Sequence, residues 1–137
     1  MDVMENLTNQ WLELKSLEKM LQQEMQVALT NGTHALTLNE FYVLHCLKET
    51  QGHKLQISAL SEKIGLSISA TSRMLTRFEE SCGVITRCVC KGDRRGVQIS
   101  LTPLGKEELA EAYRLVEPVL AKYQAQLSNF SNRNEAK

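Results

Sequence analysis

The stretch that decides the fold spans residues 57–101 and reads ISALSEKIGLSISATSRMLTRFEESCGVITRCVCKGDRRGVQISL. Its first eight residues place apolar side chains at helical spacing, and Gly65 then interrupts the pattern where a chain must turn sharply. A helical period resumes after Ser67 or Ser69, either of which can cap a helix that continues to about Ser81. The stretch therefore predicts two helices joined by a tight glycine turn.

Beyond the second helix, the spacing of apolar residues changes to two. Residues 84–89 and 97–101 are predicted as strands, and the polar residues 91–96 as the turn of a β-hairpin. This turn contains one lysine and two arginines, so the tip of the hairpin is cationic. Helix, turn, helix and hairpin follow one another in the order of a winged helix-turn-helix.

Helices are also expected on both sides of this unit. An apolar stripe runs over residues 7–29 and stops near Asn31-Gly32. A second helix begins at Thr37, and Glu40 three residues later completes the pattern of a capping box. The sequence Thr102-Pro103 begins the last long helix.

The C-terminal helix contains Pro118, which is expected to bend or split it, and the polar tail from Ser131 is expected to fray. The apolar stripes at both ends of the chain are too long for one small winged core to cover. This excess of apolar helix favours a partner subunit.

The composition is that of one ordinary soluble domain. The chain has 137 residues, of which 42% are hydrophobic and 23% charged. Acidic residues interrupt the first twenty positions, which argues against a signal peptide, and no stretch approaches the roughly 18 apolar residues of a membrane span. A cytoplasmic protein without membrane association is expected.

The net charge of zero hides a gradient along the chain. Residues 1–52 contain three basic and seven acidic residues, whereas residues 53–106 contain nine basic and four acidic residues. A basic middle between acidic flanks is typical of a DNA-binding module on a neutral scaffold, although chance clustering of charges is the alternative.

The second helix of the pair has an outer face that is suited to DNA. Four of its residues are expected to turn inward, namely Thr71, Met74, Leu75 and Phe78. The outer face then holds Ser69, Ala70, Ser72, Arg73, Thr76 and Arg77. Short side chains allow close approach to the major groove, and arginine can pair with guanine through two hydrogen bonds. Taken alone, this face could equally belong to a solvated amphipathic helix, but the neighbouring basic hairpin favours DNA binding.

These segments resemble the MarR-type (multiple antibiotic resistance regulator) family of transcription factors. The resemblance rests on residues 36–44, on residues 60–87 and on Asp93-Arg94-Arg95 leading to Leu101-Thr102-Pro103-Leu104-Gly105, and it covers roughly residues 4–130. It implies a mainly α fold with a small β-hairpin wing, that is, an α+β winged helix-turn-helix.

The resemblance also implies how the chain is organised. Residues 1–137 would form a single domain, with dimerisation helices in residues 4–35 and 104–130 and a DNA-binding lobe in residues 36–103. The implied protein is a homodimeric repressor that binds double-stranded DNA at a pseudo-palindromic, inverted-repeat operator and is released by an effector. No cofactor, metal ion or enzymatic activity is implied.

Individual positions match the recognition helix and wing of the family. Asp93 would support the wing, Arg95 would enter the minor groove, and Arg94 and Lys91 would contact phosphates. The full set of candidate DNA contacts is Ser67, Ser69, Ala70, Ser72, Arg73, Thr76, Arg77, Lys91, Asp93, Arg94 and Arg95. The run from Arg77 to Val84 is one residue longer than the family pattern, so the register of the hairpin can shift by one.

Other polar and aromatic residues suggest regulation. Three cysteines flank the hairpin, and Cys82, Cys88 and Cys90 are candidates for a thiol-redox response, the alternative being incidental thiols. The histidines and Cys46 have no spacing that places two metal ligands on one helix face, so no metal site is expected.

An effector pocket, if present, would lie between the winged lobe and the dimerisation helices. Its candidate lining residues are Trp11, Phe41, His45 and Tyr113, which could equally be core residues. The rival function of another class is a winged-helix protein-interaction module that does not bind DNA. Arg73, Arg77 and Arg95 argue against this rival, because an interaction module does not require all three.

Overall fold

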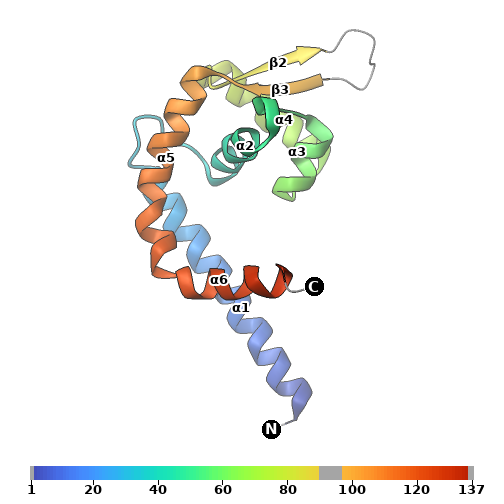
Figure 1. The fold of residues 1–137 in the computed structure, drawn as a ribbon, viewed down its shortest axis with the longest axis vertical. Helices are drawn as coiled ribbons and strands as arrows, with labels where there is room; N and C mark the ends of the chain where they lie inside the picture. Colours follow the sequence, from blue (N-terminus) through green and yellow to red (C-terminus); the bar gives the residue numbers. More distant parts are fainter. Residues whose placement is uncertain (1, 90–96, 136–137) are drawn as a thin grey trace.

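A computed structural model describes residues 2–89 and 97–135 (Figure 1). The described chain contains α1 (Val3–Leu29), α2 (Leu38–Glu49), a 3-10 turn η1 (Gln51–His53), β1 (Lys54–Gln56), α3 (Ile57–Ile64), α4 (Ile68–Cys82), β2 (Ile85–Val89), β3 (Val97–Leu101), α5 (Pro103–Lys122) and α6 (Gln124–Glu135). The winged helix-turn-helix order and the mainly helical fold are confirmed.

Most of the helices begin at a residue whose side chain caps the first turn. The Oγ1 atom of Thr37 accepts a hydrogen bond from the backbone N–H of Glu40, whose carboxylate accepts one from the N–H of Thr37, which confirms the capping box. Ser67 rather than Ser69 caps α4, because its Oγ accepts from the N–H of Ala70 at 3.1 Å. These bonds satisfy backbone donors that have no partner inside the helix.

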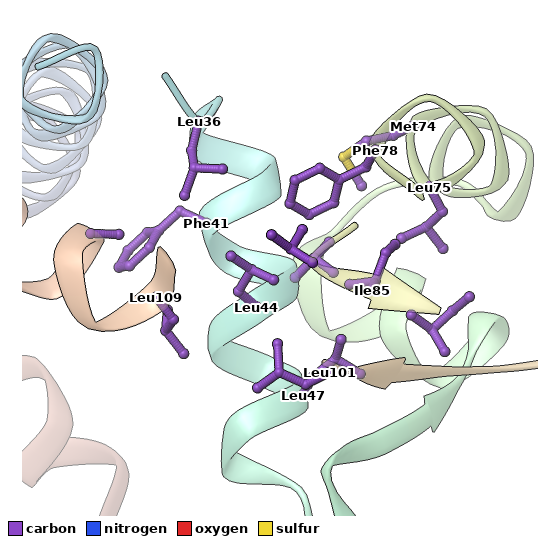
Figure 2. Packing of buried hydrophobic residues seen from close by; sticks show 14 of the residues in the cluster. Leu36, Phe41, Leu44, Leu47, Met74, Leu75, Phe78, Ile85, Leu101 and Leu109 are labelled. Carbon is purple, nitrogen blue, oxygen red and sulfur yellow. The ribbon is translucent and has the colours of Figure 1, made fainter. Parts of the chain in front are cut away.

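The core is built around α2. Val43, Leu44 and Leu47 are fully buried there, and Leu75 and Phe78 of α4 are equally buried in the same cluster (Figure 2). Burying one such side chain contributes about 1.5–3 kcal/mol to stability, so the contacts that orient α4 are strong ones. The inner face of α4 is therefore part of the main core.

The wing is part of a three-stranded antiparallel sheet in the order β1-β3-β2. Both predicted hairpin strands are present, and Arg87 of β2 pairs with Ile99 of β3. Strand β1, whose Leu55 also pairs with Ile99, was not predicted from the sequence. Three residues are too few to show an alternating pattern, and β1 exists because β3 offers it a free edge.

The structure differs from the prediction of a split at Pro118. Helix α5 continues through Pro118, and the split occurs at Tyr123 (φ −112°). Helix α6 continues past Ser131 to Glu135. A proline removes one backbone hydrogen bond without ending a helix that is held on both sides, and Val116 is buried here.

The end of α5 is held against α1. The Nζ of Lys122 donates to Oε1 of Glu24 at 2.7 Å, and the hydroxyl of Tyr123 donates to Oε2 of the same carboxylate at 2.9 Å. The hydrogen bond from Lys122 is the main reason why the pKa of Glu24 is lowered from its usual value. Figure 1 shows that the N-terminal half of α1 extends away from the lobe that carries α3, α4 and the sheet.

None of the helices in the described ranges combines the length and the apolar character that crossing a membrane requires.

Gly105 in the first turn of α5 provides a test of this packing. A Cβ atom at this position would overlap the carbonyl oxygen of Val84, a backbone atom that cannot swing aside. We expect Gly105→Ala to lower the free energy of unfolding by about 3 kcal/mol, as measured by urea denaturation. The control is Gly65→Ala, where an added Cβ atom would meet no other atom within 4 Å. There the left-handed φ of +76° alone should lower the free energy of unfolding by about 1 kcal/mol. Equal losses in the two variants would contradict the packing.

Candidate nucleic-acid interface

The outward face of α4 forms the candidate interface. Its buried side holds Thr71, Met74, Leu75 and Phe78, as predicted. Ser69, Arg73, Thr76 and Arg77 are exposed, and Ala70 and Ser72 are half-buried. A hollow of about 530 Å³ lies on this face, lined by Ala70, Ser72, Arg73, Thr76 and Arg77. Six of the seven α4 and cap residues predicted to contact DNA therefore lie on one helix face, with the exposed cap Ser67 at its start.

Thr71 occupies an inward position without leaving a polar atom unsatisfied. It is fully buried, and its Oγ1 donates a hydrogen bond to the carbonyl oxygen of Ser67 at 2.8 Å. Burying a hydroxyl is costly only when it has no hydrogen-bond partner. A threonine is thus tolerated at a buried position of the helix.

The turn before α4 sets the angle of the helix pair. Gly65 adopts a left-handed conformation with φ of 76° and caps α3, and the N–H groups of Gly65 and Leu66 both donate to the carbonyl oxygen of Ser61. Ser61 is itself buried, so a small side chain lies where the helices approach each other. The glycine turn was predicted from the sequence, and the structure places it at the end of α3.

Arg87 is a residue that the sequence analysis did not assign to the interface. It lies on β2, and its guanidinium reaches back to α4, where it donates to Oε2 of Glu79 at 2.8 Å and to Oγ1 of Thr76 at 2.7 Å. These contacts join residues that are eight and eleven positions apart. No local sequence pattern announces them, because they depend on how β2 folds back along α4.

The candidate DNA contacts of the wing belong to the segment between β2 and β3. Lys91, Asp93, Arg94 and Arg95 lie outside the described residues, as does Cys90. Helix α4 ends at Cys82, one residue beyond the predicted end, and Gly83 follows it in a left-handed conformation with φ of 66°. Of the three candidate redox cysteines, Cys88 alone has a described side chain, and it is an exposed free thiol.

Three of the four candidate effector-pocket residues lie together. Nδ1 of His45 and the hydroxyl of Tyr113 are 2.6 Å apart, and the rings of Phe41 and Tyr113 meet edge to face with centroids 5.8 Å apart. The Nζ of Lys48 lies 5.4 Å from the centroid of the Tyr113 ring. This cluster joins α2 to α5, and Phe41 belongs to the core.

Trp11 lies apart from this cluster. It is 57% exposed on α1 and lines a separate groove between α1 and α6, which also includes Leu14, Leu127 and Phe130. In the part of the chain that the structure describes, no three His, Cys, Asp or Glu side chains are grouped so that they could hold a metal ion.

Comparison with known proteins relates this geometry to one family. The family model described as MarR family matches residues 36–97, which include α2, α3, α4 and the first two strands. No curated protein sequence matches the chain. The family consists of transcription regulators, which are not enzymes.

Solved structures share the fold over nearly the whole chain. AbsC, a MarR family transcriptional regulator from Streptomyces coelicolor, is 22% identical with a TM-score of 0.80, covering 99% of this chain and 90% of that one. A point mutant of MarR from E. coli, solved with operator DNA, is 19% identical with a TM-score of 0.74 and coverages of 97% and 98%. NadR, solved with 4-hydroxyphenylacetate, is 20% identical with a TM-score of 0.68 and coverages of 92% and 91%.

The cluster around Tyr113 makes a prediction about pH. Burial, followed by the charges of Glu49 and Cys46, raises the pKa of Tyr113 above its usual value of 10. Stability from this group is therefore fully present below pH 10 and is lost as the pH rises through the raised pKa. We expect Tyr113→Phe to lose less unfolding free energy than the wild type between about pH 9 and pH 11 in urea titrations. An equal loss in both proteins would show that Tyr113 does not carry this dependence.

Proposed function

We propose that this chain, whose residues 36–97 match the MarR family model, is a homodimeric repressor of an inverted-repeat operator. In this proposal α4 enters the major groove and the wing enters the neighbouring minor groove. An effector would release the dimer from DNA. The proposed location is the cytoplasm, because the protein must reach its DNA operator there.

The observation that carries the proposal is the chemistry of the outward face of α4. The six residues predicted to contact DNA on this face are small, hydroxyl-bearing or cationic, and the exposed carboxylate of Glu80 follows them in the last turn of the helix. Arg73 and Arg77 are exposed and project from a helix whose opposite face is locked in the core. A rigid helix with short side chains and free guanidinium groups is suited to contact both base edges and phosphates.

The dimer is supported by apolar surface that one chain cannot cover. Eight large hydrophobic residues of α1 are exposed, and Leu127 and Phe130 of α6 are exposed beside them. Patches of this size usually mark an interface. A second copy that covers residues 4–35 and 104–130 would place two recognition helices about one turn of DNA apart, roughly 34 Å, which requires an inverted repeat.

The site for an effector is proposed at the contact between α2 and α5. Phe41, His45 and Tyr113 lie there, with Lys48 as a nearby cation. A small aromatic molecule that binds between these helices would change how the lobe is oriented on the dimerisation helices. Such a ligand acts by shifting the population between dimers that fit DNA and dimers that do not.

Selection of binding sites from random duplexes, read by sequencing, tests the proposal. We expect enrichment of an inverted repeat whose half-sites are about one helical turn apart. Sedimentation equilibrium of the purified complex should show two chains per duplex. If no sequence is enriched and a protein partner is bound through α4 instead, the chain is an interaction module and not a DNA-binding regulator.

Arg73 should contribute to sequence reading. We expect Arg73→Ala to cost about 1–3 kcal/mol of binding free energy at the selected site and to relax the preference at one position in each half-site. Fluorescence anisotropy with a panel of single-base operator variants measures both effects. Lys54→Met, which removes one exposed positive charge from β1, outside α4 and outside the helices proposed to dimerise, is the control for net charge. A uniform loss across all sequences would make Arg73 a phosphate contact.

A further inference from the structure

We infer that Arg87 is a positioning residue for DNA reading, which braces the wing strand β2 against the recognition helix α4. This inference rests on the proposed function, because its effect is measured through DNA. The brace sets the angle between the element that enters the major groove and the element that enters the minor groove. Arg87 itself does not contact DNA.

The contacts of the guanidinium carry this inference. Nε donates to Oε2 of Glu79 at 2.8 Å, and Nη2 donates to Oγ1 of Thr76 at 2.7 Å and to the carbonyl oxygen of Ser72 at 3.4 Å. One side chain of β2 thus holds two successive turns of α4. The side chains of Arg87 and Glu79 are 29% and 36% exposed, so the contact is partly shielded from water.

The strand at the other end of the brace is also anchored. Arg87 pairs across the sheet with Ile99, which is fully buried in the core. Side chains alternate along a strand, so Arg87 projects from the opposite sheet face to its neighbours Thr86 and Cys88. A change at Arg87 therefore alters how β2 lies along α4 without removing a core side chain.

The hydroxyl of Thr76 makes two hydrogen bonds within the protein. It accepts from Arg87 and donates to the carbonyl oxygen of Ser72 at 3.0 Å. The sequence analysis assigned Thr76 to DNA contact. The hydrogen bonds instead assign its hydroxyl to the brace, which leaves Arg73 and Arg77 as the long cationic side chains exposed on this face.

The charge of Arg87 is also used within the protein. Its ion pair with Glu79 neutralises a carboxylate on the same helix as Arg73 and Arg77. The planar guanidinium can donate to the carboxylate, the hydroxyl and the carbonyl at once, whereas a lysine ammonium cannot match this geometry. A lysine at position 87 would still attract a phosphate, and this difference separates a brace from a DNA contact.

The test compares Arg87→Met and Arg87→Lys with the wild-type dimer, with Lys54→Met on β1 as the matched control for charge. For each protein, the dissociation constant is measured at the selected operator and at a scrambled duplex over a series of salt concentrations. Thermal unfolding shows that each variant is folded, and if Arg87→Met is not, Arg87→Lys and Thr76→Val carry the comparison.

We expect both Arg87 variants to lose about 10- to 100-fold in affinity for the operator and less than about threefold for the scrambled duplex. The slope of log K against log salt should stay unchanged, because no phosphate contact is lost. Lys54→Met should leave the ratio of the two affinities unchanged. The brace is overturned if Arg87→Lys binds like the wild type, or if Arg87→Met lowers both affinities equally and reduces the slope by about 0.9 for each contact.

A double-mutant cycle with Thr76→Val tests the hydroxyl. We expect Thr76→Val to lose operator affinity in the wild-type background and to lose little more in the Arg87→Met background, because both substitutions remove the same contact. A loss that persists in full would make Thr76 a direct DNA contact and overturn this part of the inference.

If the wild type selects no DNA sequence, the proposed function fails and the inference fails with it. If the wild type does select a DNA sequence but Arg87→Met keeps the wild-type ratio of operator affinity to scrambled-duplex affinity, the brace is rejected and the proposed function stands.

Discussion

The burial of one face of α4 is the constraint on which the rest of the structure depends. Leu75 and Phe78 are fully buried in the cluster that surrounds α2, and the left-handed turn at Gly65 sets the angle at which α4 leaves α3. Once this face is locked, the side chains opposite to it have no freedom to turn inward. The polar face of the helix is therefore a consequence of core packing, and its rigidity is what makes it suitable for reading DNA.

The same core divides the molecule into two regions with different surfaces. The lobe of α2, α3, α4 and the sheet buries its apolar residues well, whereas α1 leaves many of its apolar residues exposed along the half that extends away from the lobe (Figure 1). Contacts of Glu24 with Lys122 and Tyr123 hold α1 against the end of α5. A partner chain that packs on these helices would be connected to α4 through α5 and α2. Its position would therefore set the distance between the two copies of α4.

Local patterns in the sequence predicted most of the lobe. The capping box at Thr37, the glycine turn at Gly65 and the inward face of α4 all follow from rules that involve neighbouring residues, and the structure has each of them. The elements that were missed depend on distant partners. Strand β1 needs the edge of β3, and the contacts of Arg87 need β2 to lie along α4. The candidate effector residues also show that residue type alone does not predict which side chains lie together. Trp11 is aromatic like the residues around Tyr113, but it lies in a different groove.

The central claim is that the outward face of α4 binds DNA while the exposed apolar face of α1 does not. The most direct measurement is a backbone amide chemical-shift titration of the isotopically labelled protein with the selected duplex. The account predicts that the largest changes lie in residues 67–77 of α4 and its cap, with small changes along residues 3–20 of α1. Large changes along α1 with an unperturbed α4 would contradict it.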